Sequence, residues 1–111
     1  MKMTSFVLIC GALLTPSLSS AAPDCRDVIG KVYLGLEGQG VDGNDGSVSF
    51  RNGTYADVVW PNRDVSENCR YRISGTSLLL RCESGLRNLR FSTNCNVIRS
   101  RTAIFRFGWR S

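Results

Sequence analysis

The amino-acid sequence predicts an all-β domain, a small antiparallel barrel or sandwich of about six to seven strands stapled by two disulfides. No segment carries apolar residues at helical spacing over the length that a helix needs. Alternating apolar and polar residues, separated by turn dipeptides, instead recur from Lys31 to the end of the chain. Four cysteines after residue 21 supply the covalent links.

The first 21 residues have the layout of a secretory signal peptide. Lys2 precedes an apolar run over residues 5–14, which is too short to span a bilayer, and small residues follow up to a cleavage site after Ala21. We therefore expect residues 1–21 to be removed and residues 22–111 to form a single domain. The product is expected to be secreted, into the extracellular space or, in a bacterium, into the periplasm.

Removal of the signal takes Cys10 away and leaves an even set of cysteines: Cys25, Cys69, Cys82 and Cys95. In an exported chain such a set predicts two disulfides, for which three connectivities are possible. The cysteines are too far apart for a zinc site and have no histidine to activate a thiol. We expect them to stabilise the fold, and we expect no metal.

The clearest hairpin joins residues 47–51 to residues 54–60 through Asn52-Gly53. This dipeptide favours a two-residue type I′ turn, which places Phe50 opposite Tyr55 on the core side. In that register Asp57 shares the core face unless a bulge or the strand end exposes it. Asn52 also begins a glycosylation sequon, which matters only in a eukaryote.

A second hairpin joins residues 69–74 to residues 77–82 through Gly75-Thr76. A two-residue turn there places Cys69 opposite Cys82 at a non-hydrogen-bonded position, where side chains lie close enough for a bridge. We therefore predict the pair Cys69–Cys82 and, by elimination, Cys25–Cys95. Alternation puts Tyr71 and Leu80 on the core face, and it puts three basic residues on the opposite face: Arg70, Arg72 and Arg81.

Four weaker strands complete the prediction, over residues 28–36, 86–92, 96–98 and 103–109. The last contains Phe105, Phe107 and Trp109, which alternation places on one face, so they favour a core position over a platform for stacking bases. Among the loops, residues 41–46 resemble a calcium-binding loop. Their glycine comes one place early and the closing glutamate is missing, so we interpret this segment as a turn.

Charge is divided unevenly along the chain. Residues 22–69 hold eight acidic and four basic residues, a net charge of −4, whereas residues 70–111 hold nine arginines and one acid, a net charge of +8. One interpretation is that the two halves neutralise each other in the fold, or that arginine only protects strand edges. The other is an acidic partner, because arginine binds carboxylates and phosphates in a bidentate manner.

The composition excludes much of enzyme chemistry. The chain has no histidine, which removes serine and cysteine triads, histidine-dependent ribonuclease mechanisms and most zinc sites. A carboxylate pair for glycoside cleavage is not indicated either, because the loop acids show no spacing that would join two of them in one cleft: Asp42, Asp45, Asp64 and Glu67. We expect no enzyme, no cofactor and no small-molecule substrate.

The predicted binding face is built on the second hairpin. Arg70, Arg72 and Arg81 lie side by side there, and Arg70 and Arg81 oppose each other across the strands, a like-charge contact that a bound anion would relieve. Arg106 and Arg110 are predicted to extend this face. The expected partner is a protein with an acidic surface, with an anionic polymer or an anionic membrane as the alternative.

The layout resembles the MAX effectors, small secreted β-sandwich proteins of plant-pathogenic fungi. The resemblance is carried by Cys25 just after the signal peptide, by Asn-Cys pairs at Asn68-Cys69 and Asn94-Cys95, and by about six short strands. It implies a protein that is delivered to a host, binds a host protein and dampens immunity. The Cys69–Cys82 bridge departs from that group. An alternative is a periplasmic inhibitor of lysozyme or another hydrolase, also a small stapled barrel, whose usual motifs this chain lacks.

Overall fold

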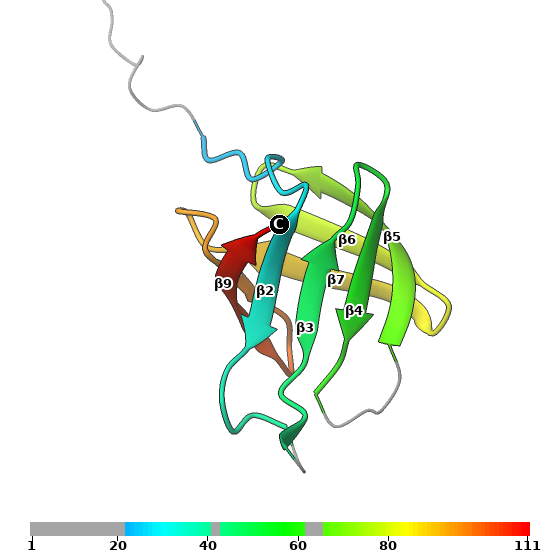
Figure 1. Cartoon of the computed structure of the whole chain (residues 1–111). Coiled ribbons are helices and arrows are strands. Elements are labelled where there is room, and N and C mark those ends of the chain that lie inside the picture. Colours follow the sequence, from blue (N-terminus) through cyan, green and yellow to red (C-terminus); the bar gives the residue numbers. More distant parts are fainter. Residues whose placement is uncertain (1–21, 41–42, 62–65) are drawn as a thin grey trace, which may run out of the picture.

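The computed structural model describes residues 22–40, 43–61 and 66–111, so the predicted signal peptide lies outside the described residues. Antiparallel strands follow one another around a closed barrel, in which the last strand pairs with the first (Figure 1). The fold class is confirmed, with eight strands rather than about six to seven. These are β2 (Lys31–Gly35), β3 (Ser47–Phe50), β4 (Tyr55–Val59), β5 (Ser66–Ser74), β6 (Ser77–Cys82), β7 (Gly85–Phe91), β8 (Val97–Arg99) and β9 (Ile104–Arg110).

Inward side chains fill the barrel with a packed core. Alternate residues of each strand point inward, and the interior of an eight-stranded barrel is only wide enough to be filled by them. Tyr33 is fully buried at the centre, where its ring makes edge contacts with Phe50 and Phe91 at centroid distances of 5.8 and 5.9 Å. Function must therefore be sought on the outer wall or at the barrel ends.

The segment before β2 closes over the barrel end that lies at the top of Figure 1. Its Cys25 and Val28 are buried against the core, and the amide of Cys25 donates a hydrogen bond to the carbonyl of Gly75 over 3.0 Å. A disulfide joins Cys25 to Cys95. This part of the chain is thus covalently fixed to the turn between β7 and β8.

The β5–β6 hairpin has the predicted register. Arg70 pairs with Arg81 and Ser74 with Ser77, and the predicted bridge between Cys69 and Cys82 is present. The two Cα atoms of that bridge lie 4.3 Å apart, the close spacing of a non-hydrogen-bonded pair. Both predicted disulfides are confirmed.

The β3–β4 hairpin differs from the prediction by one residue. Phe50 pairs with Ala56 instead of Tyr55, so the prediction of a two-residue Asn-Gly turn was wrong. The side-chain oxygen of Asn52 accepts hydrogen bonds from the amides of Thr54 and Tyr55, both over 2.8 Å, which stabilises a longer loop. The shift moves Tyr55 and Asp57 to the outer face.

A bulge in β9 separates the three aromatic residues that alternation placed on one face: Phe105, Phe107 and Trp109. Phe105 is buried, but Phe107 is 36% exposed and Trp109 51% exposed. The register shifts between Tyr33, which pairs with Phe107, and Val32, which pairs with Trp109, so Gly108 is the extra residue. Trp109 therefore leaves the inward row. Within the described residues, no helix is long and apolar enough to cross a membrane.

Candidate binding surface

The outer faces of β5 and β6 form a shallow groove of about 300 Å³ that holds all three predicted hairpin arginines. The loop between β3 and β4 borders it on one side. None of the described residues that line it is acidic: they are Gly53, Thr54, Arg70, Tyr71, Arg72, Leu79 and Arg81.

Pairing across the strands arranges these side chains in rows. One row crosses four strands from Tyr55 on β4 through Arg70 and Arg81 to Leu86 on β7. Tyr55 and Leu86 are 39% and 58% exposed, so each end of this row presents apolar surface beside the guanidinium groups. The surface can therefore contact both charge and hydrophobic groups of a partner.

The groove arginines have no acidic partner among the residues that the structure describes. The ion pairs among the described residues are Arg26–Asp24, Arg51–Asp57 and Arg110–Asp27. Two of these lie within the acidic half of the chain, and Arg110–Asp27 joins the two halves. Arg70, Arg72 and Arg81 make neither an ion pair nor a side-chain hydrogen bond within the described part of the chain, and Glu83 in the nearby β6–β7 turn does not reach them. Their charge is available to an external group.

Asp57, the acidic residue of β4, already has hydrogen-bond partners on the outer face. Its carboxylate accepts hydrogen bonds from Arg51 over 2.6 Å and from Asn68 over 2.9 Å. Partial burial alone would raise the pKa of Asp57, but these hydrogen bonds and the charge of Arg51 outweigh it and hold the pKa below its usual value. Asp57 is therefore ionised and paired at neutral pH, and it does not neutralise the groove.

Tyr71 gives the groove a rigid wall. Its ring packs edge-on against buried Phe50 at 5.0 Å, and its hydroxyl donates a hydrogen bond to the carbonyl of Asn52 over 2.6 Å. Burial raises the pKa of Tyr71, so the phenol stays protonated. The turn between β3 and β4 is thereby fixed beside the arginines.

The basic surface extends onto β7 and β8, which the sequence did not predict, and it does not extend onto β9, which the sequence did predict. Arg90 on β7 directly opposes Arg99 on β8, a second like-charge pair that sequence analysis missed because it depends on how β7 meets β8. Arg106 and Arg110 lie on β9, three strands away from β6 around the barrel, so the structure does not bring them into the groove. Arg110 is also paired with Asp27.

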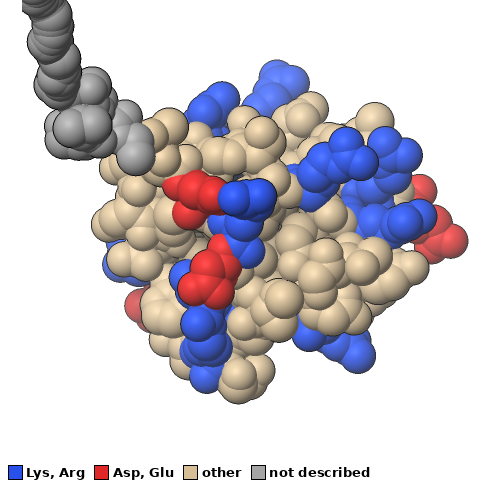
Figure 2. All heavy atoms as spheres, turned by 90° about the horizontal axis from the view of Figure 1, so that it is seen from above, with Lys and Arg blue, Asp and Glu red and all other residues tan. Residues whose placement is uncertain are grey.

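Figure 2 looks onto the barrel end that is at the top of Figure 1. Basic side chains gather on its right, the side where Figure 1 shows β5 and the turn between β6 and β7. Acidic groups lie at the outer edge of this basic group, and acidic and basic groups lie side by side near the middle of the face. The view agrees with a basic surface on one side of the barrel.

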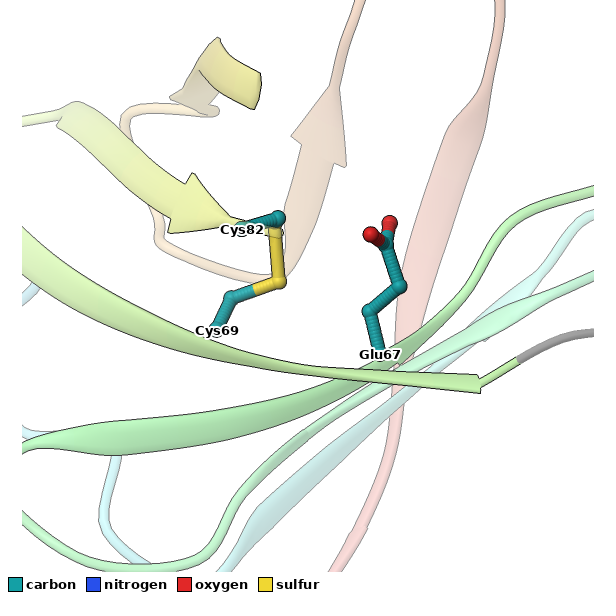
Figure 3. A group of neighbouring side chains, drawn as sticks. All are labelled: Glu67, Cys69 and Cys82. Atoms are coloured by element: carbon teal, nitrogen blue, oxygen red, sulfur yellow. A yellow bond between two sulfur atoms is a disulfide. The ribbon is translucent and has the colours of Figure 1, made fainter. Parts of the chain in front are cut away.

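Glu67, Cys69 and Cys82 lie within metal-binding distance of one another (Figure 3), but they do not form a metal centre. The two sulfur atoms are bonded to each other and offer no thiolate. Glu67 instead accepts hydrogen bonds from the indole of Trp60 over 2.6 Å and from the amide and hydroxyl of Ser84 over 3.0 and 2.9 Å. This carboxylate fixes the end of β4 to the β6–β7 turn.

The other loop acids, for which the sequence indicates no catalytic pair, can be placed only in part. Asp45 accepts hydrogen bonds from the amides of Gly38 and Gly40 over 3.0 and 3.2 Å, so it orders its own loop. Asp42, within the calcium-like run, and Asp64 lie outside the described residues.

Two disulfides in a domain of this size are compatible with an extracellular or secreted protein. Comparison with the models of known protein families, with curated proteins and with solved structures finds no match for this chain.

Proposed function

We propose that this protein is a secreted, non-enzymatic binding protein that holds an acidic surface of another protein in the groove between β5 and β6. One observation carries the proposal: Arg70, Arg72 and Arg81 converge on one groove without an ion pair among the described residues. Opposed arginines repel each other on a free surface, so a carboxylate placed between them gains contact and removes repulsion.

A protein partner is favoured over a uniform anionic polymer by the groove's mixed lining. Leu79 and Tyr71 lie among the arginines, and the row through Arg70 and Arg81 ends in exposed Tyr55 and Leu86. Interfaces between proteins combine aromatic and arginine side chains in this way. The resemblance to MAX effectors implies that the partner is a host protein and that binding suppresses its role in immunity.

The test uses two variants of equal charge. R70Q/R72Q/R81Q removes three positive charges from the groove, and K31Q/R106Q/R110Q removes three from β2 and β9. A candidate partner is first captured from host extract on the wild-type protein, then purified and titrated against all three proteins by calorimetry. We expect a one-to-one complex that persists at physiological salt, is lost with the groove variant and is retained by the β2/β9 variant.

Two results would contradict the proposal. Unchanged affinity of the folded groove variant would remove the site from consideration. Retention on heparin or nucleic acid that falls steeply with salt, without a stoichiometric protein complex, would instead assign the groove to anionic polymers.

A further inference from the structure

The barrel wall opens between β7 and β8. β7 runs over seven residues, yet only Arg90 and Phe91 pair with β8. β8 ends at Arg99 because the next residues form a tight turn, in which the hydroxyl of Ser100 accepts the amides of Thr102 and Ala103 over 3.2 and 2.9 Å. Among the described residues, the first part of β7 therefore has no strand paired to it on the side of β8 and forms an edge in the closed barrel.

Hydrogen-bond alternation identifies which groups this edge exposes. The amide of Phe91 donates to Thr76, so the odd-numbered residues of β7 bond to the β6 side. The N–H and C=O groups of Leu86 and Asn88 must then point away from β6, and neither residue has a backbone hydrogen bond to another described residue on that side. With respect to the described part of the chain, two residues thus offer unused donors and acceptors at strand spacing.

A cleft of about 620 Å³ lies beside this edge. Its lining combines an apolar part, Trp60, Pro61 and Leu86, with two cations, Arg87 and Arg101, and no acid is among its described lining residues, of which the others are Asn88, Ser100 and Thr102. Arg87 lies over the Trp60 ring at 5.8 Å and donates a hydrogen bond to Ser84 over 3.3 Å. Neither Arg87 nor Arg101 has an acidic partner within the described residues.

We propose that this cleft binds an acidic peptide segment in extended conformation, which adds as a strand to the free edge of β7. Backbone groups of Leu86 and Asn88 supply the pairing, Trp60 and Leu86 contact apolar side chains of the peptide, and Arg87 and Arg101 contact its carboxylates. The inference does not depend on the proposed function, because the groove arginines do not line this cleft.

Charge argues against a second copy of this chain as the occupant. Antiparallel edge-to-edge pairing of the free residues of two β7 strands would bring Arg87 of one copy against Arg87 of the other. Like charges directly opposed across a ladder are destabilising. An acidic peptide meets the same edge with attraction instead.

The test uses a blocked eight-residue peptide of alternating glutamate and valine, titrated into isotope-labelled protein. In the free protein the amides of Leu86 and Asn88 should exchange rapidly with solvent, whereas those of Arg87 and Leu89, which bond to β6, are protected. Bound peptide should protect Leu86 and Asn88. The same peptide N-methylated at alternate residues should fail to bind, because it lacks the donors that pair with the edge.

Matched variants locate the contact. N88P removes an outward N–H without breaking the β6–β7 ladder and should weaken peptide binding about tenfold, whereas N88A keeps that N–H and should bind like the wild type. R87Q/R101Q should lower the affinity for the peptide and make that affinity less dependent on salt. R70Q/R72Q/R81Q should leave peptide binding intact even if it abolishes binding of the protein partner.

The proposal is overturned if the N-methylated peptide binds as well as the parent, or if millimolar peptide leaves the Leu86 and Asn88 amides unprotected. Dimerisation of the protein through β7 at low salt would assign the edge to a second copy instead. The N-methylated control uses wild-type protein, so it decides the question even if N88P does not fold.

Discussion

Arg70 and Arg81 face each other directly across the β5–β6 ladder, and neither has an acidic partner among the described residues. Like charges at directly opposed strand positions cost a few tenths of a kcal/mol or more. The fold tolerates this repulsion because the Cys69–Cys82 bridge and the buried side chains of the same hairpin fix its register.

Replacing Arg81 by glutamine should therefore stabilise the free protein. We expect the free energy of unfolding to rise by a few tenths of a kcal/mol at low ionic strength and the gain to disappear near 1 M salt, where charges are screened within about 3 Å. Denaturant unfolding at two salt concentrations measures the difference. R106Q is the control, because Arg106 lies opposite Leu34 and Val97 instead of another charge. Loss of stability in R81Q at both salt concentrations would show that the arginines support the fold.

The two disulfides should differ in their contribution to stability. Cys69 and Cys82 are 13 residues apart and Cys25 and Cys95 are 70 apart, so the second bridge restricts the unfolded chain more. C69A/C82A should lower the free energy of unfolding by roughly 3 kcal/mol or less, and C25A/C95A by roughly 1 kcal/mol more. Denaturant unfolding of both double variants tests the order. The reverse order would indicate that strain or residual structure outweighs loop closure.

Gln39 holds the long β2–β3 connection against β9, and its loss should be costly. Its amide nitrogen donates to the carbonyls of Asp45 and Ile104 over 2.9 and 2.8 Å, and its oxygen accepts the amide of Ile104 over 2.9 Å. Q39A should destabilise the protein by about 1 to 3 kcal/mol, because it leaves partly buried backbone groups unpaired. Q39E has nearly the same shape but loses both donors at neutral pH, so it should lose at least as much stability at pH 7 and recover part of it on acidification. A neutral effect of Q39A would mean that water replaces the side chain.

The sequence predicted those parts of the fold that depend on one turn and its flanking alternation. Gly75, with a φ of 61°, adopts the left-handed conformation at the β5–β6 turn, and this local feature fixed the arginine face and both disulfide pairs. The β3–β4 turn failed because the side chain of Asn52 binds two backbone amides and lengthens the loop. An Asn-Gly pair can form a two-residue type I′ turn or a longer loop held by the Asn side chain, and turn propensity alone does not decide between them.

The remaining site residues depend on contacts that are distant in sequence. Arg90 meets Arg99 only because β7 and β8 pair over two residues, and the cleft beside β7 exists only because β8 stops at the Ser100 turn. Arg106 is separated from the groove because β9 closes the barrel onto β2. Strand alternation indicates which residues share one face of a strand, but it does not indicate which strands become neighbours.

Tyr33 should make the protein sensitive to alkaline pH. Its hydroxyl donates to the carbonyl of Cys95 over 2.6 Å in the core, and desolvation there, opposed by the charge of Arg110 and assisted by that of Asp27, raises the pKa of Tyr33 to about 12. Because the pKa is about 10 in the unfolded chain, ionisation between pH 10 and 12 occurs mainly after unfolding. The stabilising contribution is thus complete below pH 10 and is lost as the pH rises toward 12.

We expect the free energy of unfolding to fall by roughly 2 to 3 kcal/mol from pH 10 to pH 12 on account of Tyr33. Y33F removes this ionisable group and should show a smaller slope over that range, although it starts from lower stability because the hydrogen bond to Cys95 is lost. Y71F provides the comparison, since burial also raises the pKa of Tyr71, but its ring is only partly buried. Denaturant unfolding at intervals from pH 9 to 12, paired with tyrosinate absorbance, measures both slopes. If Y33F kept the full wild-type slope, the alkaline loss of stability would have to originate in other groups.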